Sequence, residues 1–205
     1  MRIALFLLLI WLPGISLLAQ PSEDVSKTCV TNAEAKLASL INEYRRSKNL
    51  NPVPLSKSLT RVAQLHARDL QENFKSGTRC NLHSWSNDSR WSSCCYTDDH
   101  KKAECMWDKP RELTSYQGDG YEIAYFSNYD YADDDEFVKD ALKGWKSSKG
   151  HNEIIINTGK WLTAEWKAMG VAVYGDYTVV WFGEVTDKEG RPERCTINTA
   201  NLDPQ

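Results

Sequence analysis

Residues 40–70 read LINEYRRSKNLNPVPLSKSLTRVAQLHARDL, a pattern typical of two helices joined by a short connector. Just upstream, residues 31–34 have the form of a capping box, in which a Thr and a Glu three residues later satisfy the first backbone N–H groups of a helix. Apolar residues then repeat at helical spacing as far as the basic pair Arg45 and Arg46. The sequence therefore predicts a first amphipathic helix that begins near residue 31.

The connector, residues 51–54, contains two prolines and ends this first helix, because proline cannot continue the hydrogen-bond ladder. A second helix is expected to begin near Ser56 or Ser58. One of its faces carries an apolar stripe made of Leu59, Val62, Ala63, His66 and Leu70. Because His66 lies within that stripe, we expect a packed structural histidine there rather than a ligand.

The second half of the chain predicts one more long helix and a small sheet. Residues 121–126 read as a strand, and residues 171–182 read as a β-hairpin with a two-residue turn. The acidic run at 130–136 precedes a helix that carries Trp145, and carboxylates favour the N-terminal end of a helix. A calcium loop is the alternative for this run, but its glycine and closing glutamate spacing are missing. The expected fold class is α+β, with helices covering an antiparallel sheet.

The stretch GWKSSKGHNEIIIN, residues 144–157, is expected to place a histidine at a fixed corner. The helix bearing Trp145 is predicted to end at Lys149 and Gly150, because glycine commonly closes a helix in the left-handed conformation. His151 follows at once, and the apolar run 154–156 should return the chain to the core. A histidine held in this way could serve as a ligand or as a base.

The N-terminus resembles a secretory signal peptide. Arg2 is followed by an apolar run from Ile3 to Leu18, and cleavage is expected after Ala19. The run is shorter than the roughly 20 residues that span a membrane, so stable membrane insertion is not expected, although an uncleaved anchor is the alternative. Residues 20–205 are predicted to form one domain, of a length that can bury a sizeable core.

The charge of the chain argues against nucleic acid or an anionic membrane as an electrostatically bound partner. The formal net charge is −3, and removal of residues 1–19, whose only charged side chain is Arg2, makes it −4.

Six cysteines behind a signal peptide predict up to three disulfides, with 15 pairings to choose from. Adjacent cysteines rarely bond to each other, so Cys94 and Cys95 are expected to pair with Cys80 and Cys105, in either order. By elimination Cys29 pairs with Cys195, a cross-link expected to stabilise the domain by about 4–5 kcal/mol.

Residues 80–118 are expected to be a surface excursion held by these cross-links, and residues 187–205 a loosely packed polar tail pinned by Cys195. Trp85, Trp91 and Trp107 lie within the excursion, where they form either a satellite core or a set of exposed contact residues. Asn87 begins the Asn-Asp-Ser sequon and is a candidate N-glycosylation site.

Several segments together resemble the CAP superfamily, which comprises cysteine-rich secretory proteins, antigen 5 and pathogenesis-related proteins (the SCP domain). They are N-x-x-R at Asn42 to Arg45, the proline connector 52–54, A-Q-x-x-A at 63–67, Cys-Asn-Leu-His-Ser at 80–84, W-x-x-S-x-G-H at 145–151 and the strands at 169–173 and 177–183. The resemblance covers residues 33–184. It implies a three-layer α-β-α sandwich whose central cleft, in many members, holds zinc between two histidines with two glutamates nearby.

On this resemblance His83 and His151 match the two histidines of the cleft. The family's G-E-N-x-A segment aligns with residues 120–124, which puts Tyr121 at the glutamate position and Glu122 one residue later. Since one residue reverses the face of a strand, either the register slips and Glu122 enters the cleft, or the site lacks that carboxylate. Ser148 stands where the second glutamate is frequent. The resemblance thus implies labile Zn²⁺ binding by His83, His151 and Glu122.

Three function classes remain. The first is a secreted, non-catalytic binding module whose cleft or surface engages a sterol or fatty acid, a glycan or another extracellular protein. The second is a secreted hydrolase, dependent either on metal or on Ser148 and His151, although no nucleophile elbow or oxyanion loop is recognisable. The third is a structural extracellular component, or a periplasmic or cell-envelope one if the chain is bacterial. The reduced carboxylate set favours binding over catalysis.

Overall fold

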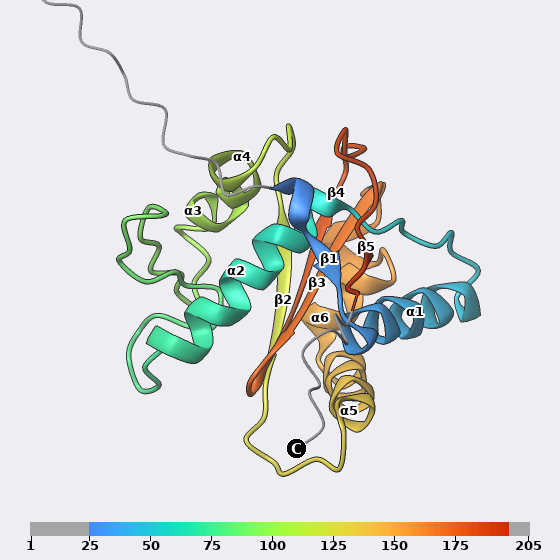
Figure 1. Ribbon diagram of the computed structural model, residues 1–205, viewed down its shortest axis with the longest axis horizontal. Helices are drawn as coiled ribbons and strands as arrows, with labels where there is room; N and C mark the ends of the chain where they lie inside the picture. Colours follow the sequence, from blue (N-terminus) through green and yellow to red (C-terminus); the bar gives the residue numbers. More distant parts are fainter. Residues whose placement is uncertain (1–24, 197–205) are drawn as a thin grey trace, which may run out of the picture.

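The computed structural model describes residues 25–196, which fold into three layers. A small antiparallel sheet lies between helix α2 (Lys57–Asn73) on one face and helices α1 (Asn32–Ser47), α5 (Asp134–Ser147) and α6 (Lys149–Ile155) on the other (Figure 1). This arrangement confirms the α-β-α sandwich expected from the sequence.

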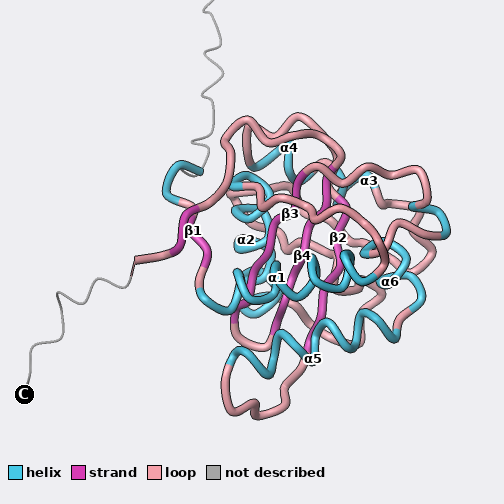
Figure 2. The backbone as a smooth tube through the Cα atoms, turned by 90° about the vertical axis from the view of Figure 1, so that its right-hand side faces the viewer, coloured by secondary structure: helices cyan, strands magenta, loops and turns pink. Residues whose placement is uncertain are grey.

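The central sheet has the strand order β2-β4-β3, formed by β2 (Tyr121–Phe126), β3 (Ala168–Tyr174) and β4 (Tyr177–Gly183). The predicted hairpin is β3 and β4, and Gly175 in its turn has φ 55°, a conformation that glycine adopts without steric cost. β2 is an edge strand, so side chains on both of its faces lie near the segments that border this edge of the sheet. Figure 2 shows the three strands side by side.

A second sheet joins the two ends of the described chain. β1 (Cys29–Val30) pairs in parallel with β5 (Glu193–Arg194). Figure 2 shows β1 apart from the three-stranded sheet.

The face covered by α1, α5 and α6 is an apolar core. The capping box of α1 is confirmed, because Thr31 and Glu34 bond to each other's backbone N–H groups. Asn42 exchanges two hydrogen bonds with the backbone of Val53, which fixes the proline connector against α1. Arg45, buried, donates to the carbonyl of Ile155 at 2.6 Å and thereby ties α1 to the end of α6. The N-x-x-R pattern is thus a pair of anchors for neighbouring segments.

Helix α2 packs closely on the opposite face. Its N-cap is Ser56, whose hydroxyl accepts from the backbone N–H of Leu59 at 2.9 Å, as the sequence predicted. A Cβ atom built on Gly170 of β3 would lie 2.1 Å from the backbone of Leu59. Glycine is therefore required at that position for the helix to approach the sheet.

The excursion contains two short helices that the sequence did not predict, α3 (Glu104–Trp107) and α4 (Lys109–Leu113). Its Trp85 and Trp91 are buried, which favours the satellite core over exposed contact residues for these two. The structure confirms the disulfide prediction and resolves its open pairing, with bonds Cys29–Cys195, Cys80–Cys95 and Cys94–Cys105.

One local prediction was wrong. Helix α5 ends at Ser147, and after a break at Ser148 the segment Lys149–Ile155 forms α6, so Gly150 does not close a helix. Ser148 leaves helical geometry, with φ −92° and ψ 118°, and this causes the break.

The described part of the predicted tail, residues 187–196, contains no buried residue and is pinned by the Cys29–Cys195 disulfide, as expected. Hydrogen bonds also hold it to the domain. Asp187 accepts hydrogen bonds from the hydroxyls of Ser56 and Ser58, and the backbone of Cys195 donates to Val30. Short 3₁₀ turns, η1 (Val25–Lys27) and η2 (Gly159–Trp161), complete the fold.

The expected signal peptide, residues 1–19, lies outside the described residues. Between residues 25 and 196 no helix is long and apolar enough to cross a membrane.

Candidate functional site

A cavity of about 560 Å³ opens at the β2 edge of the sheet, and it gathers every cleft residue expected from the sequence. These are His83, Tyr121, Glu122, Ser148 and His151. The rest of its lining comes from the excursion, the α5–α6 junction and η2, and includes Tyr96, His100, Ala103, Met106, Trp107, Ile123, Gly150, Ile154, Lys160 and Trp161. The cavity therefore combines a few polar groups with mainly apolar and aromatic walls.

His151 reaches this cleft from α6, and two indole hydrogen bonds hold α6 and the preceding helix α5 in place. The indole of Trp145 in α5 donates to the carbonyl of Ala124 in β2 at 3.1 Å. The indole of Trp166 donates to the carbonyl of Ile154 at 2.8 Å, and Ile154 itself is buried. His151 thus lies at a packed helix, in place of the glycine corner that was predicted.

The alternation of side chains along β2 determines which way its two candidate residues, Tyr121 and Glu122, point. β2 pairs with β4 without a slip, with Tyr121 opposite Phe182 and Glu122 opposite Trp181. Successive side chains point to opposite faces, so Tyr121 packs against an aromatic group formed by Trp107, Trp161 and Trp166. Glu122 turns toward α2. It still lines the cleft, because β2 is the edge strand.

Glu122 bridges two histidines. Its Oε1 is bonded to Nδ1 of His66, and its Oε2 lies 2.9 Å from Nδ1 of His83. The carboxylate and the His66 ring are fully buried, whereas the His83 side chain keeps 18% exposure toward the cleft. His66 is therefore both a core residue, as predicted, and a member of the site's hydrogen-bond network.

Burial and charge shift the pKa values of this network in opposite ways. Burial alone would lower the pKa of His66, but attraction and hydrogen bonding to Glu122 raise it overall. Burial alone would raise the pKa of Glu122, yet His66 and His83 hold it below its usual value. The pKa of His151 is lowered by burial and then by the neighbouring His83, so its neutral form is favoured.

The hydrolase arrangement is not assembled in the described structure. Ser148 lies at the α5–α6 break and its side chain makes no capping hydrogen bond to α6. No hydrogen bond joins its hydroxyl to His151, and Glu122 is bonded to His66 and His83, so it does not orient His151. A nucleophile, base and orienter in contact with one another are what such catalysis needs.

The donor atoms do not fit the zinc site that the resemblance implied. Both carboxylate oxygens of Glu122 are already bonded to imidazole nitrogens. Within residues 25–196, no group of three or more His, Cys, Asp or Glu side chains is arranged to hold a metal ion. Two imidazoles without a free carboxylate fall short of the three or four protein ligands usual for zinc.

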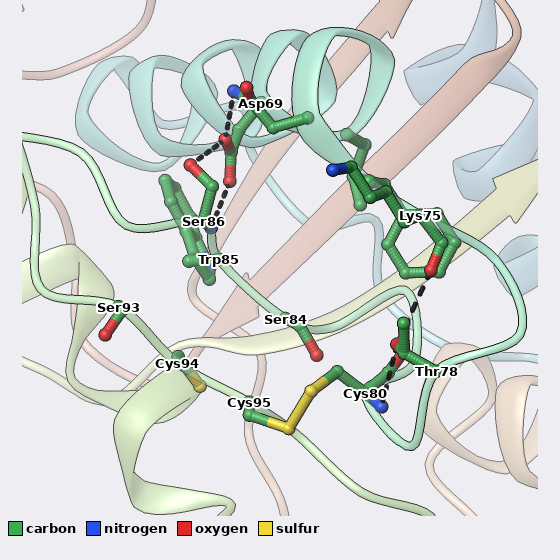
Figure 3. A pocket seen from close by; sticks show the side chains of 13 residues that line it. Asp69, Lys75, Thr78, Cys80, Ser84, Trp85, Ser86, Ser93, Cys94 and Cys95 are labelled. Carbon is green, nitrogen blue, oxygen red and sulfur yellow. Dashed lines mark hydrogen bonds between the residues drawn. A yellow bond between two sulfur atoms is a disulfide. The ribbon is translucent and has the colours of Figure 1, made fainter.

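A second cavity, of about 270 Å³, lies beneath the C-terminal half of α2. Figure 3 shows the segment carrying Ser84, Trp85 and Ser86 passing between α2 and the Cys80–Cys95 disulfide. Asp69 of α2 accepts from the backbone N–H of Ser86 at 2.8 Å. This contact holds the segment in place, and the segment in turn carries the backbone carbonyl that His66 contacts.

Sequence reasoning missed His100, Trp161 and Lys160 as cleft residues, and it missed the role of His66 in the site. His66 lies in an apolar helical stripe and Glu122 in an apolar strand, and each would need a polar partner once buried. Two polar residues of this kind, in elements predicted to pack together, are expected to be each other's partners. The sequence therefore contained a signal for this contact. No comparable signal marks His100 or Lys160.

The chain belongs to the CAP family, described as the cysteine-rich secretory protein family, because the family model matches residues 38–182. Its fold is the CAP fold, stabilised here by three disulfides. A search of curated protein sequences found no match.

Three solved structures from bacteria are similar to this chain. A cysteine-rich secretory protein of Staphylococcus aureus is 18% identical, with a TM-score of 0.48, over 75% of this chain and 38% of that one. An extracellular protein containing a SCP domain, from Bacillus anthracis, is 20% identical, with a TM-score of 0.48, over 75% and 40%. An outer surface protein of Borrelia burgdorferi is 21% identical, with a TM-score of 0.48, over 73% and 90%. This chain thus matches less than half the length of the first two proteins.

Proposed function

We propose that this protein is a secreted, non-catalytic binding module that takes a small, mainly apolar ligand bearing a hydroxyl group into the cleft at the β2 edge. A sterol is the representative probe for this class. The observation that carries the proposal is the composition of the cleft, where aromatic and aliphatic side chains form walls beside polar ones that include His83 and His151. The cleft is also lined by the polar side chains of His100, Glu122, Ser148 and Lys160. Its volume of about 560 Å³ lies in the range typical of small-molecule sites.

The aromatic walls support an apolar ligand. The rings of Tyr121 and Trp161 lie 4.9 Å apart between centroids, and Trp161 and Trp166 lie 5.4 Å apart. Such interlocked rings give a large contact area at low cost in conformational entropy, because each ring is already held by its neighbours. A preformed wall of this kind suits the flat face of an apolar ring system.

The polar side of the cleft supports a hydroxyl group on that ligand. Nδ1 of His83 is bonded to the acceptor Glu122, so this nitrogen carries a hydrogen, and in the neutral tautomer with Nδ1–H the other nitrogen, Nε2, is an acceptor. A lowered pKa likewise favours the neutral form of His151, which retains one acceptor nitrogen. Acceptors facing an apolar cavity select a ligand with a hydroxyl donor over a purely hydrocarbon one.

Secretion is supported by the cysteines of the chain. All six are paired in three disulfides, which form and persist in oxidising compartments. N-terminal sequencing of the secreted protein should find the mature chain beginning at Gln20. Retention of residues 1–19 on an exported, membrane-bound product would contradict this part of the proposal.

Equilibrium binding of a labelled sterol tests the ligand proposal. We expect saturable binding by the wild type and at least about tenfold weaker binding by Trp161→Ala, since a buried aromatic anchor is worth about 2 kcal/mol or more. Tyr129→Ala is the matched control, because this ring is 70% exposed and lies outside the cleft lining. A fatty acid and a neutral oligosaccharide, measured in parallel, test the other ligand classes. The proposal fails if the sterol does not saturate, or if both variants bind it equally.

A further inference from the structure

The imidazole of His66 has acceptor atoms opposite both of its nitrogens. Nδ1 is bonded to Oε1 of Glu122, and Nε2 lies 3.0 Å from the backbone carbonyl oxygen of Ser84. A carbonyl oxygen and an ionised carboxylate only accept hydrogen bonds, so each ring nitrogen must bring its own hydrogen. With Glu122 ionised, the network is satisfied only when His66 is the doubly protonated imidazolium.

The alternative is a neutral pair, with the proton on Glu122 and none on Nδ1 of His66. Three neighbours disfavour it. His83 donates to Oε2 of Glu122 at 2.9 Å, which favours the carboxylate, and the charge of Asp69 favours a cation at His66. The ring of Trp85 is stacked on His66, with centroids 4.4 Å apart and planes 8° apart, so the π-face of the indole lies against the imidazole.

The remaining groups around His66 are compatible with the charged form. The rings of Trp181 and His66 meet in an edge-to-face arrangement, with their centroids 6.3 Å apart. Lys109, whose Nζ lies 5.2 Å from the centroid of Trp85, is a second buried cation near this indole, but it is compensated by Glu112 at 2.6 Å.

We infer that His66 is a resident cation of this site: its buried imidazolium neutralises Glu122 from the α2 side and takes the role that a divalent metal would otherwise serve at that carboxylate. A metal bound to Glu122 would have to displace His66 or His83 from one of the two oxygens. The ion pair also makes His66 a positioning residue. It keeps Glu122 ionised, and the ionised Glu122 holds the Nδ1–H tautomer of His83, with Nε2 directed away from that bond.

Nitrogen-15 NMR of the uniformly labelled wild-type protein tests the charge directly. At pH 8, where an ordinary histidine is neutral, we expect both ring nitrogens of His66 to give protonated imidazolium signals and His83 to be the neutral Nδ1–H tautomer. Excess zinc chloride should leave both signatures unchanged. A neutral His66 at pH 8 overturns the inference, and so does stoichiometric zinc binding that removes a proton from His66.

Two variants separate the charge of His66 from its packing. His66→Gln removes the cation and keeps a hydrogen-bond donor, whereas His66→Lys restores a cation on an unbranched side chain. We expect zinc affinity, measured by calorimetry, to rise about tenfold in His66→Gln, the scale on which outer-shell partners alter metal sites, and to stay at the wild-type level in His66→Lys. The His83 tautomer should become mixed in His66→Gln and return in His66→Lys. Equal zinc affinity in the two variants contradicts the inference, and the wild-type spectra decide it if either variant fails to fold.

Discussion

The two faces of the central sheet are built by different chemistry. The α1, α5 and α6 face is packed mainly with aliphatic side chains such as Leu37, Ile41, Val138 and Ile155, together with the rings of Trp145, Trp166 and Phe182. Its helix α1 also buries charged side chains, Arg45 among them. The α2 face mixes tryptophan rings with buried charges, among them His66, Glu122, Asp69 and Lys109. Two of the three disulfides also lie on this side, in the excursion that covers it.

The two faces also differ in the hydrogen bonding of their buried indole groups. On the α2 face the indole N–H groups of Trp85, Trp91 and Trp181 are buried and find no acceptor among residues 25–196, whereas those of Trp145 and Trp166 on the other face donate to backbone carbonyls. Cross-links help to offset the cost of such unpaired groups, because they restrict the unfolded chain. The charged network on the cross-linked face reaches the cleft through His83, which is bonded to Glu122.

Breaking the buried ion pair should have the largest effect on stability. We expect Glu122→Gln to lower the free energy of unfolding by about 3–5 kcal/mol, because it leaves the His66 imidazolium buried without its counter-charge. Denaturant unfolding monitored by tryptophan fluorescence measures this. Glu43→Gln, at an exposed site of α1, is the control and should change stability by less than about 0.5 kcal/mol. Equal losses in the two variants would show that the pair is not charged.

A cavity on the apolar face should cost somewhat less. Leu37→Ala removes a fully buried side chain of α1 and should lower the free energy of unfolding by about 2–5 kcal/mol, with about 3 as the central value. The same substitution at Leu162, which is 72% exposed, is the matched control. Because Leu37 lies in the core opposite the ion pair, Leu37→Ala should leave the pH profile of stability unchanged in shape. A changed shape would mean that the two faces are not independent.

The pH dependence of stability should identify the charged face. The pKa of His66 is raised in the fold, so its stabilising contribution is complete below the unfolded value of 6.5 and is lost as pH rises through the folded pKa. The pKa of Glu122 is lowered, so its contribution is complete above 4.5 and is lost as pH falls through the folded pKa. The pair should therefore contribute most between about pH 4.5 and 6.5.

The pKa of His151 is lowered, which has the opposite sign to His66. The unfolded chain binds a proton there below pH 6.5 that the folded cleft resists, so stability falls on the acid side by up to about 1.4 kcal/mol per pH unit. We expect His66→Gln to flatten the alkaline limb of a stability-versus-pH curve and His151→Gln to flatten the limb just below pH 6.5. If both variants changed the same limb, one of these assignments would be wrong.

Helix caps on the two faces should give the smallest effects, in a defined order. Thr31→Ala removes the cap of α1 and should cost about 1 kcal/mol. Ser56→Ala should cost about 2 kcal/mol, because that hydroxyl is buried and, besides capping the helix, donates a second hydrogen bond to Asp187 at 2.7 Å that the variant also loses. Thermal unfolding of the two variants in one buffer gives the comparison. The reverse order would show that the tail contact adds nothing to the cap.

The sequence predicted most of the fold because its elements carry strong local signals. The caps at Thr31 and Ser56, strand 121–126 and the 171–182 hairpin are all present. The α5–α6 break was missed because Gly150 is an ordinary helix-closing signal. The break instead comes from the backbone geometry of Ser148, for which the residue types give no signal. The helices α3 and α4 are one turn long and too short to show periodicity.

The candidate site was predicted in part for a similar reason. His83 and His151 were located by motif and do line one cleft. The placement of Glu122 depended on the strand register, which a single sequence leaves open, and on its contact with a helix 56 residues earlier in the chain. The only sequence signal for a long-range pairing of this kind is a pair of polar residues that are expected to be buried and have no local partner.

The disulfide Cys29–Cys195 gives the domain a mechanical property. It joins positions 166 residues apart, beside the parallel pair β1 and β5, so a force applied to segments outside the two cysteines passes through one covalent bond and bypasses the sheet. We expect the oxidised domain to resist stretching until that bond is reduced. Reduction would then release about 50–60 nm of chain as the domain unfolds under load.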